Sequence, residues 1–336
     1  MPLRVAINGF GRIGRLVLRS IVEHARRDIE VVSINDLGSV EANAHLLRYD
    51  SVHGRFPGLV STTADTIDIG LGPIKVTAIR SPAELPHREL GVDIALECTG
   101  LFTKKDAAAQ HLAAGAKRVL VSAPCEGADK TIVYGVNHES LTADDLVVSN
   151  GSCTTNALAT VCRVLLDVAG IERGYMTTIH AYTGDQPTQD TLHADLYRAR
   201  AAAMSMIPTS TGAAKALGLV LPELTGKLDG SSIRVPTANV SVVDLKIVPT
   251  RDVTKDQIND AFRAAAGAGP LRGILGVTDE PLVSVDLNHV ANSSTAALPQ
   301  TQIVDGKLVR VLAWYDNEWG FSTRMADTAL AMGKLI

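Results

Sequence analysis

The feature that most constrains the fold is a glycine-rich turn near the start of the chain. A short apolar run at 4–8 leads into Gly9, Gly11 and Gly14, and residues 16–24 continue with helical spacing. A second apolar run ends at Asp36, about 20 residues beyond the last glycine, as a dinucleotide fingerprint requires. Such glycines let the backbone approach a pyrophosphate at a helix N-terminus, and the acid can bind ribose hydroxyls. The pattern therefore predicts a dinucleotide-binding Rossmann unit rather than a purely structural glycine turn.

Further strand-like runs extend this first unit. They lie at 74–79, 92–98 and 118–122, and each ends in small or polar residues. In a parallel sheet these carboxyl ends line the ligand crevice. A crossover helix is expected at 107–114, with Gly115 as its stop, whereas residues 37–73 show no regular pattern.

The second half of the chain has a different pattern. After the strand expected at 145–148 and a helix ending near Gly170, strands are predicted at 175–180, 233–235, 240–248, 282–285 and 307–314. Helices are expected to open near 212, after a Thr254/Gln257 capping box, and at 324. The segment 182–203 is a long polar stretch without periodicity, which is typical of a functional loop or one packed by a partner subunit.

These patterns predict an α/β chain of two domains, as a length of 336 residues also favours. Residues 1–151 form a doubly wound parallel sheet, and residues 152–316 form an α+β domain with a mixed or antiparallel sheet. The C-terminal helix within 317–336 is expected to pack back on the first domain.

Composition narrows the function classes. A net charge of −4 argues against nucleic acid as the primary partner, and no apolar run approaches ~20 residues, the length of a membrane span. The N-terminus enters a strand-like run without a leader pattern. The four cysteines lack metal-ligand spacing, so we expect reduced thiols, no metal site and a cytoplasmic location.

Cys153 stands where the strand at 145–148 gives way to a helix. The helix start offers unpaired N–H groups and the positive end of the helix dipole, both of which favour a thiolate. Two threonines and Asn156 follow within three residues. The alternative is a buried, inert cysteine at an ordinary turn.

A reactive cysteine needs a base or a cationic partner. His180, at the end of the strand at 175–180, is the best candidate, although a strand-end histidine can equally be a surface residue. Arg198 and Arg200 could form surface ion pairs, but Arg234 lies between apolar neighbours and implies an anion partner. A dinucleotide, a thiol, a histidine and arginines together indicate oxidation of a phosphorylated aldehyde through a thioester.

Five longer motifs carry a family resemblance over essentially the whole chain. The sequence resembles the glyceraldehyde-3-phosphate dehydrogenases that are phosphorylating and NAD-dependent. The matching segments are Asn8-Gly9-Phe10-Gly11-Arg12-Ile13-Gly14-Arg15, Ser152-Cys153-Thr154-Thr155-Asn156, Ser210-Thr211-Gly212-Ala213-Ala214-Lys215, Asn239-Val240-Ser241-Val242-Val243-Asp244 and Trp314-Tyr315-Asp316-Asn317-Glu318.

The resemblance implies a role for each matching position. Cys153 is the expected nucleophile and His180 the residue that activates it. Thr183 and Arg234 match the site of the substrate's phosphate, whereas Ser152, Thr154, Arg198, Thr211 and Gly212 match the region of the attacking phosphate. The expected NAD contacts are Gly9, Gly11, Arg12, Ile13, Gly14, Asp36, Arg80, Ser122 and Asn317.

The implied substrates are D-glyceraldehyde 3-phosphate and inorganic phosphate, and the implied assembly is a homotetramer in which the loop from 182 crosses an interface. Asp36 followed by Leu37 favours NAD, because a carboxylate repels a 2′-phosphate, but Thr191-Leu192 departs from the Leu-Pro pair of some strictly NAD-using members. Two alternatives stay open. One is an erythrose-4-phosphate dehydrogenase, although this chain differs from the pattern of that relative at Thr183 and in the motif at 211–214. The other is a non-catalytic NAD-loaded binding protein.

Overall fold

The N-terminal strand–helix–strand unit forms as the sequence predicts. Strands β1 (Leu3–Asn8) and β2 (Ile29–Asn35) pair in parallel, and helix α1 (Arg12–Glu23) connects them. The helix begins earlier than expected, so Gly14 lies in its first turn, where a Cβ would stand 2.1 Å from the Gly9 carbonyl oxygen. Gly9 itself has φ of +88°, and a Cβ there would stand 2.7 Å from the Thr99 nitrogen. Both positions therefore require glycine.

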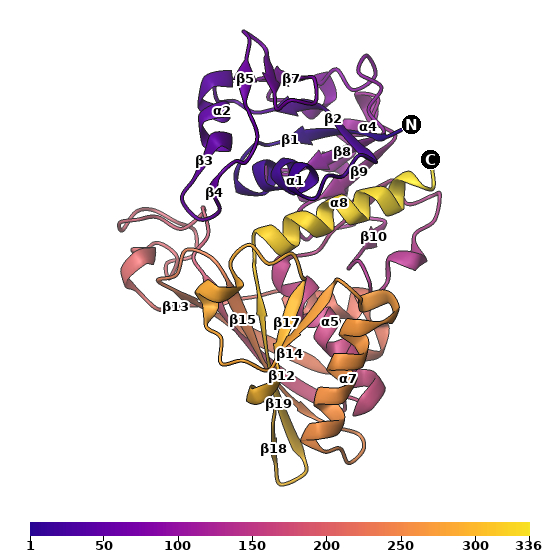
Figure 1. Ribbon diagram of the computed structural model, residues 1–336, viewed down its shortest axis with the longest axis vertical. Helices are drawn as coiled ribbons and strands as arrows, with labels where there is room; N and C mark the ends of the chain where they lie inside the picture. The colour runs from indigo at the N-terminus through magenta and orange to yellow at the C-terminus, as the bar shows by residue number, and fades with distance from the viewer. The chain divides into compact units, whose positions relative to one another are not determined.

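The computed structural model describes all 336 residues, and its internal contacts divide the chain into two compact units (Figure 1). The first unit comprises residues 1–132, 138–151 and 322–336, and the second comprises residues 133–137 and 152–321. Each unit is built around one large sheet. The predicted α/β fold class, a Rossmann sheet plus an α+β domain, is confirmed.

The sheet of the first unit has nine strands in the order β10-β11-β9-β8-β1-β2-β7-β6-β5. Pairing is parallel from β10 to β7 and antiparallel at the β7-β6-β5 edge. Beyond β1 and β2, these strands are β5 (Ser61–Thr62), β6 (Thr66–Asp68), β7 (Pro73–Thr77), β8 (Ile94–Glu97), β9 (Arg118–Val121), β10 (Lys130–Thr131) and β11 (Val147–Ser149). The crossover helix expected at 107–114 is two short helices, α3 (Lys105–Ala108) and α4 (Gln110–Ala113).

The C-terminal helix is α8 (Trp319–Gly333), and from Ser322 onward it belongs to the first unit. This part of the helix lies beside α1 (Figure 1). The Ser20 and Thr323 hydroxyl oxygens are 2.9 Å apart, and Arg26 Nη1 lies 2.8 Å from Asp327 Oδ1. Most of the helix is buried, so it is a structural part of this unit rather than a mobile tail.

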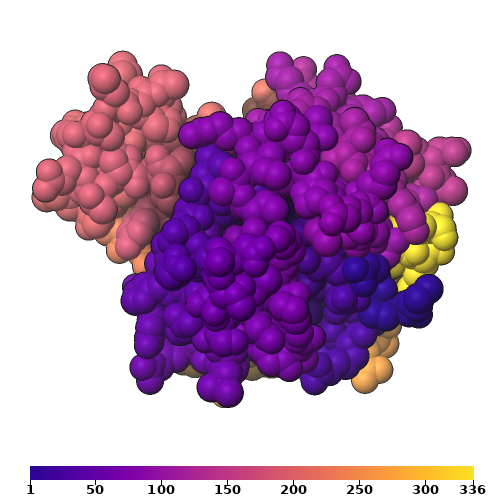
Figure 2. Space-filling view, turned by 90° about the horizontal axis from the view of Figure 1, so that it is seen from above, coloured from indigo at the N-terminus to yellow at the C-terminus, as the bar shows by residue number.

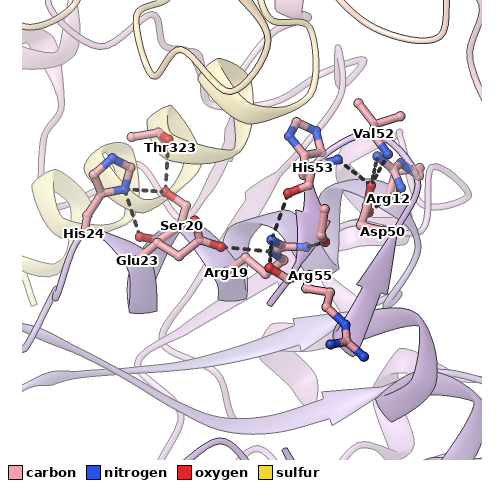
Figure 3. A network of polar contacts seen from close by, with 11 residues as sticks. Arg12, Arg19, Ser20, Glu23, His24, Asp50, Val52, His53, Arg55 and Thr323 are labelled. Atoms are coloured by element: carbon pink, nitrogen blue, oxygen red, sulfur yellow. Dashed lines mark hydrogen bonds and ion pairs between the residues drawn. The ribbon is translucent and has the colours of Figure 1, made fainter. Parts of the chain in front are cut away.

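Residues 37–73, which showed no regular pattern in the sequence, contain helix α2 (Val40–Arg48) and a hairpin of β3 (Tyr49–Asp50) and β4 (Gly54–Arg55). Arg19 of α1, only 2% exposed, donates to the carbonyl oxygens of residues 53, 54 and 55 at 3.0–3.4 Å (Figure 3). Arg12 pairs with Asp50 through two contacts of 2.5 and 3.2 Å. The hairpin is therefore attached to α1 by two arginines.

The sheet of the second unit runs β13-β14-β12-β15-β19-β17-β16, with β18 also pairing β19, and mixes parallel and antiparallel pairs. Its strands are β12 (Arg173–Ala181), β13 (Ile207–Ser210), β14 (Leu228–Val235), β15 (Ser241–Val248), β16 (Leu275–Thr278), β17 (Ser294–Ala297), β18 (Gln302–Val304) and β19 (Leu308–Tyr315).

Three helices pack on this sheet and share one hydrophobic core with it: α5 (Cys153–Val168), α6 (Ala213–Val220) and α7 (Lys255–Gly267). The predicted capping box opens α7, with Thr254 and Gln257 each accepting from the other's backbone N–H. The strand predicted at 282–285 is wrong. The chain instead forms a 3₁₀ turn over Ser284–Leu287, with Val283 and Val285 exposed.

Candidate active site

Cys153 is the first residue of α5, and Ser152 caps that helix by accepting from the Thr155 N–H at 3.0 Å. Its thiol faces β12, where His180 is the penultimate residue. Cys153 Sγ lies 3.5 Å from His180 Nε2. His180 Nδ1 lies 2.6 Å from the Ala181 carbonyl oxygen, so that nitrogen carries the hydrogen and Nε2 presents its lone pair to the thiol. This geometry allows the imidazole to accept the thiol's proton.

The protonation of the two groups follows from burial and from one nearby cation. Burial and the neighbouring Arg234 lower the pKa of His180 to about 3, so the free imidazole is neutral and able to act as a base. Burial raises the pKa of the Cys153 thiol, although Arg234 and N–H groups at the start of α5 oppose that rise. The helix start therefore contributes as expected, but it does not by itself produce a thiolate. Transfer of the thiol's proton to His180 would form an imidazolium–thiolate pair, in which the two opposite charges stabilise each other.

Arg234 connects this pair to a chain of charged residues. It lies on β14 directly opposite His180, and its Nη1 donates to the Ala181 oxygen at 3.1 Å and to Thr183 Oγ1 at 2.8 Å. The Thr183 hydroxyl donates to Asp185, which accepts from Arg198 Nη1 at 3.2 Å. Arg234 Nε is buried without a partner. An unpartnered guanidinium N–H beside a thiol suits an anionic ligand.

The remaining residues expected at the attacking phosphate are arranged less closely. The Thr154 hydroxyl is buried 2.8 Å from the Tyr315 hydroxyl, and its backbone N–H lies at the helix start. Gly212 precedes α6, and Thr211 Oγ1 accepts from the Ala213 N–H at 3.2 Å. No hydrogen bond joins Thr211 or Gly212 to Cys153, His180 or Arg234. The exposed Arg200 pairs with Asp190 and lies outside this network.

The predicted dinucleotide contacts fall mainly in the first unit. Gly9, Gly11, Asp36 and Arg80 line a cavity of about 350 Å³ at the carboxyl ends of β1, β2 and β8. The Asp36 carboxylate accepts from the N–H groups of Phe10 and Gly38 at 2.8 and 2.9 Å. A Cβ at Gly11 would meet nothing within 4 Å, so the turn is open toward solvent. This open glycine cradle at a helix start fits a pyrophosphate.

Five further predicted contacts lie outside the lining of that cavity. Arg12 and Ile13 occupy the first turn of α1 with Gly14, and Ser122 follows β9. Asn317 belongs to the second unit, where its Oδ1 accepts from the Ser241 hydroxyl at 2.8 Å. That hydrogen bond leaves the Asn317 amide group as a donor.

Comparison with known proteins identifies the family. The profile described as the NAD binding domain of glyceraldehyde 3-phosphate dehydrogenase matches residues 3–105, and that of its C-terminal domain matches residues 152–317. The glyceraldehyde-3-phosphate dehydrogenase of Xanthobacter flavus is 73% identical over 335 residues, covering all of both chains. The chain belongs to the glyceraldehyde-3-phosphate dehydrogenase family. Relatives of the same name from Cereibacter sphaeroides and Zymomonas mobilis are 70% and 58% identical, again over the full length of both chains.

Membership of the glyceraldehyde-3-phosphate dehydrogenase family makes the chain an NAD-dependent oxidoreductase. No three histidine, cysteine or acidic side chains are grouped to bind a metal, and none of the helices combines the length and hydropathy needed to cross a bilayer. Sequence reasoning missed two residues that the network uses. Asp185 bridges Thr183 and Arg198, and the Tyr315 ring packs edge-on against His180 with centroids 5.9 Å apart. Asp185 has no sequence signal of its own, and Tyr315 was recognised only as part of the motif at 314–318, because its contact with His180 joins distant segments.

Proposed function

We propose that the chain catalyses the phosphorylating oxidation of D-glyceraldehyde 3-phosphate to 1,3-bisphosphoglycerate, with inorganic phosphate as the acceptor. The observation that carries this proposal is the 3.5 Å contact between Cys153 Sγ and His180 Nε2, with Arg234 beside it. A thiol with a neutral base can form a thioester, and a neighbouring guanidinium can hold phosphate groups.

Cys153 and His180 have separate roles in the proposed reaction. The Cys153 sulfur attacks the aldehyde carbon to form a thiohemiacetal, and His180 Nε2 takes the hydroxyl proton as the carbon is oxidised. NAD bound at the glycine turn would supply the acceptor for the hydride of this carbon. A phosphate oxygen then attacks the thioester carbonyl, which releases the acyl phosphate and regenerates the Cys153 thiol.

We assign anion binding to the residues around this thiol. Thr183 and Arg234 hold the substrate's own phosphate, while Ser152, Thr154, Arg198, Thr211 and Gly212 serve the attacking phosphate. The contact of Thr183 with Arg234, and the positions of Thr154 and Gly212 at the starts of α5 and α6, support this assignment.

Dinucleotide binding uses the glycine turn and its neighbours. Gly9, Gly11 and Gly14 allow close approach of the pyrophosphate, and Arg12, Ile13, Arg80 and Ser122 complete the contacts in the first unit. Asp36 binds the adenosine ribose, and the Asn317 amide holds the nicotinamide carboxamide. We therefore assign NAD binding to a domain of residues 1–151 with the C-terminal helix, and catalysis to a domain of residues 152–316.

We further propose that the chain works as a homotetramer in the cytoplasm. The segment 182–206 exposes five large apolar side chains: Leu192, Leu196, Tyr197, Met204 and Met206. Figure 2 shows this part of the chain as a salmon-coloured lobe. Leu192 is fully exposed in the single chain, and an apolar cluster of this kind marks a protein interface. Light scattering during gel filtration measures the mass, and a monomeric enzyme would contradict the tetramer. The four free cysteines support a reducing compartment.

The deciding experiment is turnover with and without inorganic phosphate. NADH formation from glyceraldehyde 3-phosphate should depend on phosphate, and arsenate should replace it. Full-rate NADH production without either anion would indicate a hydrolytic enzyme. Erythrose 4-phosphate offered under the same conditions tests the alternative substrate, which the relatives' names do not favour. A folded protein that binds NAD but turns over neither aldehyde would support a non-catalytic role.

A further inference from the structure

A buried polar chain crosses the carboxyl edge of the sheet in the first unit, and the mechanism above does not use it. It runs from His87 through His111, Glu97 and Asn8 to Asn35, and each of these residues is at most 8% exposed. His87 Nε2 lies 2.9 Å from His111 Nδ1, and His111 Nε2 lies 3.0 Å from Glu97 Oε2. A buried network of this length is costly unless its members are satisfied.

Glu97, the last residue of β8, is the acceptor at the centre of this chain. Four groups donate to its two oxygens: Asn8 Nδ2 at 2.6 Å, His111 Nε2 at 3.0 Å, the Thr99 N–H at 2.8 Å and the Thr99 hydroxyl. Only an ionised carboxylate accepts at all four positions, since an amide would replace one oxygen by two further donors. The site therefore requires the acid and not merely its shape.

The far side of the chain continues to the next strands. Asn8 Oδ1 accepts from Asn35 Nδ2 at 2.8 Å, and Asn35 Oδ1 accepts from the Ile79 N–H at 2.8 Å. The network thus spans the ends of β8, β1 and β2 and reaches the residues that follow β7. Asn8, Asn35, Ile79 and Thr99 all line the 350 Å³ cavity that also contains Asp36 and Arg80.

We propose that Glu97 is a positioning residue for the adenosine half of the dinucleotide. Its carboxylate holds Thr99 and Asn8 in place on one wall of the cavity, and Asn8 in turn holds Asn35 on the adjoining wall. Thr99 also packs against Gly9, which makes the glycine turn depend on the same anchor. The inference rests on the proposed use of NAD, but it concerns ground-state binding and not the chemistry at Cys153.

The first test is Glu97→Gln, which preserves shape and removes the charge. We expect the dissociation constants of AMP and NAD to rise at least about tenfold, the size of effect that follows from leaving a buried donor unsatisfied. At saturating NAD, kcat and the rate of Cys153 alkylation should stay within about twofold of wild type, as expected for an effect on binding alone. The exposed Glu139→Gln serves as the matched control and should change none of these values.

A charge swap tests the same idea without relying on loss alone. In Asn8→Asp combined with Glu97→Gln, the new amide donates to the new carboxylate and the network keeps its single negative charge. This double variant should recover AMP affinity relative to Glu97→Gln. Asn8→Asp alone sets two carboxylates against each other and should bind AMP more weakly than wild type.

Thr99→Val keeps the assay informative if Glu97→Gln does not fold, because it deletes one donor and retains the shape. It should weaken AMP binding about threefold, the lower end for one lost hydrogen bond, whereas Thr99→Ser should not. Wild-type AMP affinity in folded Glu97→Gln or in Thr99→Val, or no recovery in the double variant, would overturn the proposal. AMP binding is measured without turnover, so failure of the proposed reaction would be seen separately.

Discussion

His180 and Arg234 lie directly opposite each other on the parallel strands β12 and β14, and Arg234 Nη1 is 3.2 Å from His180 Nδ1. A permanent cation at this distance disfavours imidazolium, which contributes to the low pKa of His180, about 3. The same guanidinium keeps a buried Nε without a partner. One arginine therefore disfavours protonation of the base and keeps one N–H without a protein partner, as the proposed phosphate binding requires.

The contact between Cys153 and His180 predicts a coupled loss of thiol reactivity and turnover in His180→Asn. The thiol loses its proton acceptor while burial still raises its pKa. Turnover should fall by about 10²–10⁴, the usual contribution of a general base. Iodoacetamide labelling at pH 7 should slow and recover only in alkali. An unchanged pH profile of labelling would remove His180 from this role.

Cys153→Ser should abolish nearly all turnover while leaving NAD affinity intact, because an alcohol supplies no anion near neutral pH. Among the four free thiols, Cys153 should label fastest. Burial raises the pKa of the Cys98 thiol to about 12, so little of it is a thiolate at neutral pH. The Cys162 side chain is fully buried and out of reach of the reagent. Peptide mapping after brief alkylation identifies the site, and preferential labelling of Cys98, Cys125 or Cys162 would contradict the assignment.

Arg234→Lys should weaken binding of both the triose phosphate and inorganic phosphate. Lysine keeps the positive charge but cannot contact Thr183, Ala181 and an anion through a planar fork. We expect losses of about 1.5–3 kcal/mol, the range for hydrogen bonds to charged groups. Steady-state KM values for both ligands measure this. NAD affinity should not change, and a general loss that includes NAD would indicate misfolding instead.

Asp36→Ala should narrow the preference for NAD over NADP. The carboxylate lines the cavity proposed for the dinucleotide and is held by two backbone N–H groups, so it would repel a 2′-phosphate there. The ratio of kcat/KM for the two cofactors provides the measurement. Equal use of both by the wild type would show that Thr191-Leu192 is the better guide to cofactor choice.

Acidification should destabilise the fold below pH 6.5, partly through His87. Burial and His111 lower the pKa of His87 to about 4, so between pH 6.5 and 4 the unfolded chain binds a proton that the folded chain does not. The free energy of unfolding therefore falls as the pH drops, by up to about 1.4 kcal/mol per pH unit for one such group. His87→Gln, which can still donate to His111, should reduce this slope in urea titrations. The exposed His45→Gln is the control and should leave the slope as in wild type.

Local patterns predicted the elements that carry their own signals. The glycine turn, the helix that begins at Cys153 and the capping box at Thr254 formed where expected, because each depends on residues close in sequence. The hairpin at 49–55 could not be predicted, since its strands have two residues each and depend on Arg19 of a distant helix. The strand expected at 282–285 failed because its β-branched residues are exposed and find no pairing partner.

The candidate site shows the same limit. Its members were recognisable singly or through the family motifs, but the pairing of His180 with Arg234 depends on the register of two strands more than 40 residues apart in the chain. Asp185 and Glu97 have no motif of their own. Asp185 accepts from Arg198, and Glu97 accepts from Asn8 and His111; only the folded chain brings these groups together.

The attachment of the β3–β4 hairpin to α1 has a consequence for the dynamics of the chain. The hairpin has too few strand contacts to be stable alone, and its carbonyl groups depend on Arg19 while Asp50 depends on Arg12. Local opening of the hairpin must break those bonds. The exchange of its amide protons with solvent should therefore depend on how firmly Arg12 and Arg19 of α1 hold the hairpin. Because Arg12 stands in the turn expected to bind the dinucleotide, the exchange rate of the Val52 and His53 amides would report occupancy of that turn from a distance.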